Sequence, residues 1–273
     1  MSKPIRPLTN KELKEIAPSL FTQQPHHEVS DRYHFIPTID VVEQLREQNW
    51  YPVSVNEAGV RDLDKDGFQS HYVRFQSFTD LINPSTNVVE LLLFNSHDRS
   101  KSFTISAGIY RYVCSNGLVI ADSVFDSYKI KHLGDRENDV ENAIARITDV
   151  KPKLLEKVNK FENIILNHDE KQAFLQSAIP LRFPEHLELD NPSDLLSPIR
   201  KSDIGKSDIY TTLNLLQEHL LSSKISGYNK DTGRRFTSKE ITSISKDVEI
   251  NKGLWDIAER VASIKDSDYL IAA

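Results

Sequence analysis

Residues 88–120 read VVELLLFNSHDRSKSFTISAGIYRYVCSNGLVI, and this stretch decides the fold class. Two runs rich in Val, Ile, Leu, Phe and Tyr flank the polar segment NSHDRSKS, a pattern typical of two strands joined by a turn. Similar runs occur upstream as YPVSVNEAGVR (51–61) and HYVRFQSF (71–78), and downstream as DSYKIKHLG (126–134). Because β-branched and aromatic residues favour strands, we predict an antiparallel sheet of about five strands.

After residue 134 the strand-like runs end, and the apolar residues are spaced as in a helix. Apolar residues recur at steps of three and four from Val140 to Ile165, which predicts long helical structure that packs on the sheet or forms a bundle or coiled-coil seam. Pro152 interrupts the run, so the helix is either kinked or consists of two helices that meet near Lys151. Thr38 is expected to cap the helix that follows it. Shorter amphipathic helices are predicted over residues 10–20, 39–48, 208–222 and 249–264.

These patterns predict an α+β protein in which the antiparallel sheet packs with long helices and the C-terminal part is helical. Three regions are expected: an N-terminal arm (1–30), an α+β core domain (31–180), and a connector with a C-terminal helical region packed on the core (181–273). Between residues 180 and 209 the prolines predict short or absent regular structure.

Composition excludes several classes of protein. Cys114 is the single cysteine, which excludes an intramolecular disulfide and a multi-cysteine zinc site and agrees with a reducing compartment. The N-terminus lacks the apolar core of a signal peptide, and no stretch reaches the roughly 18 apolar residues needed to span a bilayer. We therefore expect a cytoplasmic protein without a membrane partner. The net charge of −6 disfavours a protein that coats duplex DNA, so any nucleic-acid site must be a local patch.

Five stretches resemble the phage and plasmid-like protein family defined as domain of unknown function 932. They are SDRYHFIPT (30–38), residues 91–120, KIKHLG (129–134), DIYTTLNLLQEHLL (208–221) and DVEINKGLWDIAE (247–259). The resemblance implies a gene carried by a phage, plasmid or integrated element in a bacterial host, and it supplies no catalytic residues. The order of elements, with a helix ending in Asn-Trp, several antiparallel strands and a long helix, is also similar to that of single-strand annealing recombinases.

Polar and basic residues gather near the predicted turns of the sheet, where Arg and Lys suit phosphate binding. Tyr110 and Tyr112 are candidate stacking surfaces for bases, although alternation places both on the face opposite Arg111. The alternative interpretation is that the tyrosines are core residues and that the basic residues are solvated or ion-paired. The candidate nucleic-acid contacts are Asn95, His97, Arg99, Lys101, Arg111, Asn116, Lys129, Lys131, Arg234 and Arg235.

Other site chemistries have weaker support in the sequence. Cys114 with His97 and Asp98 suggests a thiol nucleophile, but a lone cysteine on a strand is more often a small buried side chain. His26 and His27 are adjacent in a loop, without the spacing of a metal-ligand motif. No glycine-rich phosphate loop is present. We therefore expect no catalytic residues, no metal and no cofactor.

These observations favour a non-enzymatic nucleic-acid-binding protein of a mobile element, with single-stranded DNA as its ligand. The alternative is a protein-interaction module that inhibits or modulates a host factor, such as a defence system. The apolar seam from Val140 to Ile165 leaves a homo-oligomer open as a further partner state.

Overall fold

The computed structural model describes residues 5–29, 35–60, 62–83, 85, 87–111, 128–129 and 136–272. The chain forms two compact units, and the division between them falls inside one helix, between Lys153 and Leu154. This division lies earlier in the chain than the boundary near residue 180 expected from the sequence. Among the described residues, no helix is both long enough and apolar enough to cross a bilayer.

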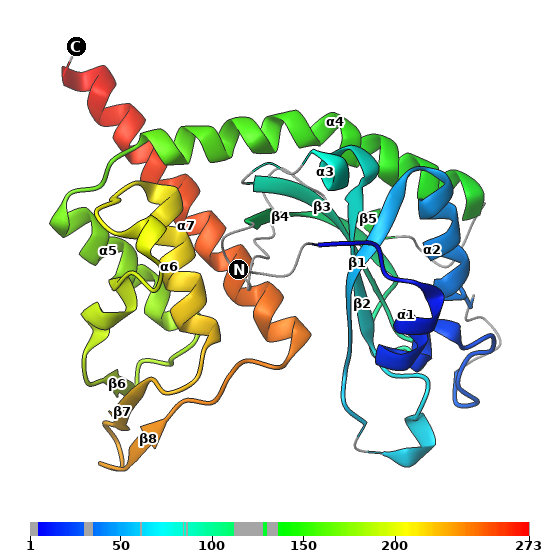
Figure 1. The fold of residues 1–273 in the computed structure, drawn as a ribbon. Helices are drawn as coiled ribbons and strands as arrows, with labels where there is room; N and C mark the ends of the chain where they lie inside the picture. The colour runs from blue at the N-terminus through cyan, green and yellow to red at the C-terminus, as the bar shows by residue number, and fades with distance from the viewer. Residues whose placement is uncertain are drawn as a thin grey trace. The chain divides into compact units, whose positions relative to one another are not determined.

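A five-stranded antiparallel sheet forms the centre of the first unit (Figure 1). The order in the sheet follows the order in the chain, so each strand pairs with its neighbours in sequence. This confirms the predicted α+β class and the antiparallel sheet. The strands are β1 (Trp50–Glu57), β2 (His71–Ser77), β3 (Asn87–Asn95), β4 (Thr104–Arg111) and β5 (Tyr128–Lys129).

The outer strand β1 is irregular. Its pairing with β2 shifts register between Pro52 and Ser54, and the backbone N–H of Leu8 donates to the carbonyl of Pro52 over 2.7 Å. The N-terminal segment is thereby tied to the sheet. A short helix, α3 (Phe78–Ile82), follows β2, and its Asp80 forms an ion pair of 2.6 Å with Lys151.

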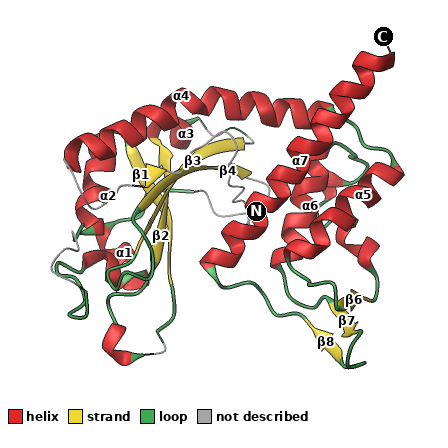
Figure 2. Ribbon diagram, turned by 180° about the vertical axis from the view of Figure 1, so that it is seen from behind, coloured by secondary structure: helices red, strands yellow, loops and turns green. Residues whose placement is uncertain are grey.

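One face of this sheet is covered by helices from the N-terminal part of the chain (Figures 1 and 2). These are α1 (Asn10–Ile16), the 3₁₀ turn η1 (Pro18–Phe21) and α2 (Thr38–Glu47). Leu13 of α1 and Leu45 of α2 are fully buried, and burial of each such side chain stabilises the fold by about 1.5–3 kcal/mol. The segment expected to be an N-terminal arm therefore contributes to the core of the first unit.

Alternation along the strands places a charged cluster on the opposite face of the sheet. Arg74 donates to both carboxylate oxygens of Glu90, over 2.6 and 2.8 Å, and Gln76 donates to the same carboxylate over 2.8 Å. Glu90 is fully buried. A buried carboxylate needs such partners because its desolvation is otherwise costly.

The second unit is mainly helical and includes a small antiparallel sheet at one end of its helices (Figure 2). Nearly every residue of α6 is buried, and the Phe161 and Trp255 rings pack with their centroids 5.1 Å apart. The elements are the C-terminal part of α4 (Arg136–Asn163), α5 (His168–Ala178), β6 (Leu187–Leu189), α6 (Ile209–Leu221), β7 (Ser226–Asn229), β8 (Arg235–Thr237) and α7 (Ile244–Ala272).

Several predicted helix limits need correction. The helix expected over residues 10–20 ends at Ile16, because Pro18 begins a separate 3₁₀ turn. Thr38 is the first residue of α2 and does not cap it, since Pro37 occupies that position and the Thr38 hydroxyl has buried partners instead. A single helix, α4, runs through Pro152, so the two-helix alternative is wrong. Ile165 lies beyond α4 and is 62% exposed.

The region between residues 180 and 209 contains only short elements, as predicted. Besides β6 it has three 3₁₀ turns. The sequence interpretation missed α5 and the sheet of β6, β7 and β8. The 3₁₀ turns are η3 (Ile179–Leu181), η4 (Pro192–Leu196) and η5 (Lys201–Asp203).

Candidate functional site

The turn between β3 and β4 is held by its own short polar side chains. The Ser96 hydroxyl accepts the Lys101 N–H over 2.8 Å and donates to the Lys101 carbonyl over 3.1 Å. Asp98 accepts the Ser100 N–H over 2.9 Å, and Arg99 adopts a left-handed backbone with φ 63°. These interactions fix the turn so that the side chains of Arg99 and Lys101 are exposed. Neither cation forms an ion pair with a residue of the described ranges.

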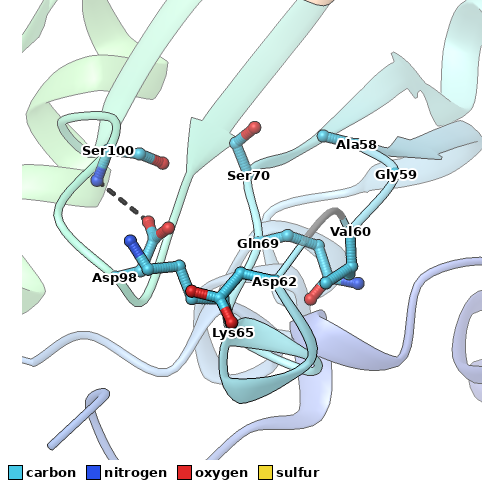
Figure 3. A pocket seen from close by; sticks show the side chains of 9 residues that line it. All are labelled: Ala58, Gly59, Val60, Asp62, Lys65, Gln69, Ser70, Asp98 and Ser100. Carbon is cyan, nitrogen blue, oxygen red and sulfur yellow. Dashed lines mark hydrogen bonds between the residues drawn. The ribbon is translucent and has the colours of Figure 1, made fainter.

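A shallow pocket of about 270 Å³ lies between this turn and the loop that joins β1 to β2 (Figure 3). Asp98 and Ser100 line one side, and Asp62, Lys65 and Gln69 come from the other loop. Partial burial raises the pKa of Asp98, but hydrogen bonds from Ser100 and the charge of Lys65 outweigh it and hold the pKa below its usual value. The pocket therefore contains fixed negative charge with one nearby cation.

Two buried histidines lie beneath this end of the sheet, joined through one hydroxyl. The His71 ring contacts the Ser19 hydroxyl through Nδ1 at 2.7 Å and the Thr38 hydroxyl through Nε2 at 2.8 Å. Nε2 of His97 lies 3.4 Å from the same Thr38 oxygen, and Asn95 donates to that oxygen over 2.9 Å. All five side chains are almost completely buried, so the network connects η1, α2, β2 and the end of β3.

Both imidazoles are held in the neutral form. Burial lowers the pKa of His71 to about 3, and repulsion by a charged His97 adds to this effect. Burial likewise lowers the pKa of His97 to about 4, although the charge of Asp98 opposes this shift. At neutral pH the network is therefore a set of uncharged hydrogen bonds.

The family described as "Domain of unknown function (DUF932)" matches residues 25–255 of the sequence. The chain belongs to this family. The match includes the β3–β4 turn, the pocket, and every member of the histidine network except Ser19. The resemblance identified from the sequence is thereby confirmed.

Two relatives of this family member come from Escherichia coli (strain K12). The chain is similar to the UPF0380 protein YafZ and to the UPF0380 protein YfjQ, with 32% identity over 254 residues in each case. Each alignment covers 93% of this chain and 91% of the relative. No solved structure matches the chain significantly, so the likeness to single-strand annealing recombinases stays a prediction.

Of the ten predicted contact residues in this DUF932 member, Asn95 and His97 are buried. Asn95 pairs with His71 across β2 and β3, which places it on the sheet face covered by α2. Its amide donates to Thr38 and to the carbonyl of Ile36. Both side chains serve the internal network in this structure and offer no surface for a ligand.

Two further candidates lie on β4 and β5. Arg111 pairs with Asn87 at the end of β4, and Lys129 of β5 pairs with Thr104. Their side chains lie outside the described part of the structure. Asn116 and Lys131 lie outside the described residues altogether, as do Tyr112 and the candidate thiol nucleophile Cys114.

The two remaining candidates belong to the second unit. β7 and β8 form a hairpin with Gly233 at φ 65° in its turn, whereas a solvated loop was the expectation for residues 230–238. Arg235 forms a bidentate ion pair with Asp190, with N–O distances of 2.7 and 3.1 Å. Its charge is therefore compensated, and the side chains of both Arg234 and Arg235 are exposed.

Sequence reasoning missed the residues that complete this end of the first unit. His71 was not singled out, because its partners Ser19 and Thr38 are 52 and 33 residues away in the chain. Lys65 was assigned only to a predicted turn over residues 63–70, and Asp62 was not singled out. A local pattern carries no signal for such long-range contacts, but the mixture of acidic and basic residues in LDKDG marked the loop as polar.

Proposed function

We propose that this DUF932 member is a non-enzymatic nucleic-acid-binding protein of a phage, plasmid or integrated element, with single-stranded DNA as its preferred ligand. The observation that carries the proposal is the hydrogen-bonded β3–β4 turn, in which Arg99 and Lys101 are exposed and have no ion pair with the described residues. Unpaired cations on a fixed backbone can contact phosphates without first breaking an internal ion pair.

The expected contact is small and local. Asp62 and Asp98 make the adjoining pocket acidic, so a phosphate would lie at the outer surface of the turn, away from the pocket. Arg99 and Lys101 supply two phosphate contacts in this arrangement. Release of counterions by two contacts to a single strand predicts a slope of about −1.4 in a plot of log affinity against log salt concentration.

Fluorescence anisotropy with a labelled single-stranded oligonucleotide and the matching duplex, over a series of salt concentrations, tests this proposal. Replacement of both Arg99 and Lys101 by Ala should weaken binding at least tenfold at low salt and remove most of the salt dependence. A matched control replaces the exposed Lys206 and Lys230 of the second unit by Ala, which removes the same charge. Absence of salt-dependent binding at micromolar protein, or an equal loss in both double variants, refutes the assignment.

A further inference from the structure

Two histidines and a carboxylate converge beside the pocket, from segments far apart in the sequence. His26 and His27 lie in the loop after η1, and Asp64 lies in the 3₁₀ turn η2 (Leu63–Lys65), 38 residues after His26. Nε2 of His26 is 3.1 Å from Oδ2 of Asp64, and Nε2 of His27 is 3.6 Å from the same oxygen. One potential ligand atom from each of the three residues lies within 4.8 Å of the others.

We propose that His26, His27 and Asp64 form a binding site for a divalent transition-metal ion of the zinc class. Zinc binds imidazole nitrogens and carboxylate oxygens at about 2.0–2.2 Å, so neighbouring ligand atoms in a tetrahedral site are about 3.3 Å apart. The two nitrogen–oxygen separations of 3.1 and 3.6 Å bracket this value. The third separation, between the imidazole nitrogens of His26 and His27, is within 4.8 Å, so movement of the exposed His27 ring completes the triad.

The three side chains differ in burial, as expected for a metal site that is open to solvent on one side. The His26 side chain is 1% exposed, whereas those of His27 and Asp64 are 70% and 58% exposed. One ligand is therefore fixed inside the fold, and the other two face solvent, from which the ion enters. Three protein ligands leave a coordination position for water or for an external oxygen donor.

Contacts around His26 fix the position of its ring: Nδ1 accepts the Glu28 backbone N–H over 3.3 Å, and Nε2 donates to Asp64. The His26 backbone N–H donates to the His97 carbonyl over 3.0 Å, and the ring packs edge-on against Phe68. Metal binding at Nε2 therefore requires the ring proton to move to Nδ1, which gives up the hydrogen bond from the Glu28 N–H. The Glu28 carboxylate lies 3.8 Å from Nδ1 and is placed to accept that proton in a hydrogen bond after a small rotation, as acidic groups do for many metal-bound histidines.

The position of His27 distinguishes a metal site from a simple histidine–aspartate pair. Asp64 already accepts a hydrogen bond from His26, so stability of the loop does not require a second imidazole. The rings of His26 and His27 nevertheless lie with their centroids 4.3 Å apart, and both direct Nε2 toward the same carboxylate oxygen. A divalent cation satisfies all three groups at once.

Zinc titration of the full chain, after removal of bound metal with EDTA, tests the proposal at pH 7.5. A chromophoric chelator in competition reports affinity, and Co²⁺ in place of zinc reports ligand geometry by its visible absorption. We expect one equivalent of zinc to bind. His27→Ala and Asp64→Asn should each weaken binding more than tenfold, and Glu28→Gln, which alters a supporting group, about tenfold.

Matched controls keep the test specific. His168→Ala removes an exposed histidine of the second unit, and Asp66→Asn removes an exposed carboxylate two residues from Asp64; neither should change the zinc affinity. Circular dichroism establishes that each variant is folded. Zinc binding with unchanged affinity in both His27→Ala and Asp64→Asn overturns the proposal. The absence of stoichiometric binding at a zinc concentration on the order of 100 micromolar also overturns it, because a functional site should be filled at that concentration. Neither result depends on whether the protein binds nucleic acid.

Discussion

Acidification should unfold the first unit because its two buried histidines must gain protons. A free imidazole has a pKa of about 6.5, whereas burial holds the pKa of His71 at about 3 and that of His97 at about 4. Both folded values are below the unfolded value. The contribution of the neutral pair to stability is therefore complete above about pH 6.5 and is lost as the pH falls toward the folded values.

The expected loss is large compared with the stability of a domain. At pH 5 each histidine is protonated in the unfolded chain and neutral in the folded one, which costs about 2 kcal/mol per residue for the 1.5 units between pH 5 and 6.5. The two histidines together should lower the free energy of unfolding by about 4 kcal/mol between pH 7.5 and pH 5. That is a substantial part of the 5–15 kcal/mol typical of folded proteins.

Urea unfolding at pH 7.5, 6 and 5, with EDTA present to exclude metal effects, measures this loss. Trp50 lies in β1 of the first unit and Trp255 in the second, so a Trp255→Phe background lets fluorescence report the first unit alone. His97→Gln should remove about half of the pH dependence, whatever its effect at pH 7.5. His168→Ala, at an exposed histidine, should leave it unchanged. A change below about 1 kcal/mol between pH 7.5 and 5 in the parent protein would refute the reasoning.

Two further predictions concern the interior of each unit, a buried ion pair in the first and close packing in the second. Arg74→Met should lower the free energy of unfolding of the first unit by about 3–5 kcal/mol, because it removes the cation that pairs with the fully buried Glu90. The double variant Arg74→Met with Glu90→Leu should recover most of that loss in the same urea assay. If the double variant shows no recovery, the loss does not originate from the unpaired charge. Gly227→Ala places a Cβ 2.1 Å from the Glu188 carbonyl oxygen and 2.8 Å from the Phe236 ring, so it should destabilise the second unit by about 1–3 kcal/mol in thermal unfolding followed through Trp255. Gly59→Ala, which meets no atom within 4 Å, is the control and should shift stability by less than about 0.5 kcal/mol.

The sheet of the first unit could be predicted because its strands carry a strong local pattern. β3 is a continuous apolar run in which Leu91, Leu92 and Leu93 are all fully buried, whereas β2 alternates, with Val73 and Phe75 fully buried on one face. Such alternation is visible in the sequence before any partner strand is known. The sheet of the second unit was missed because β6 has only three residues, Leu187–Leu189, too few to show a period.

The candidate site could be predicted only in part, because side-chain environment depends on register and on distant segments. The sequence placed Asn95 and Arg99 beside the same turn, but pairing of β2 with β3 directs Asn95 into the covered face. Arg235 resembled a free cation until the hairpin brought it to Asp190, 45 residues earlier. The convergence of His26 with Asp64 is equally non-local. The polar segment itself is exposed only from Arg99 to Ser102, because Asn95, Ser96 and His97 are buried.

The irregular outer strand β1 has a consequence for the behaviour of concentrated protein. Pro52 has no N–H that could donate to a strand of a second molecule, and its carbonyl already accepts the N–H of Leu8. The register shift between Pro52 and Ser54 also interrupts the regular spacing of backbone groups along this edge. A regular edge strand without such features can pair with the edge strand of an identical chain, and repeated pairing leads to polymers. Growth of the sheet from molecule to molecule through β1 is therefore blocked, and any self-association must use other surfaces.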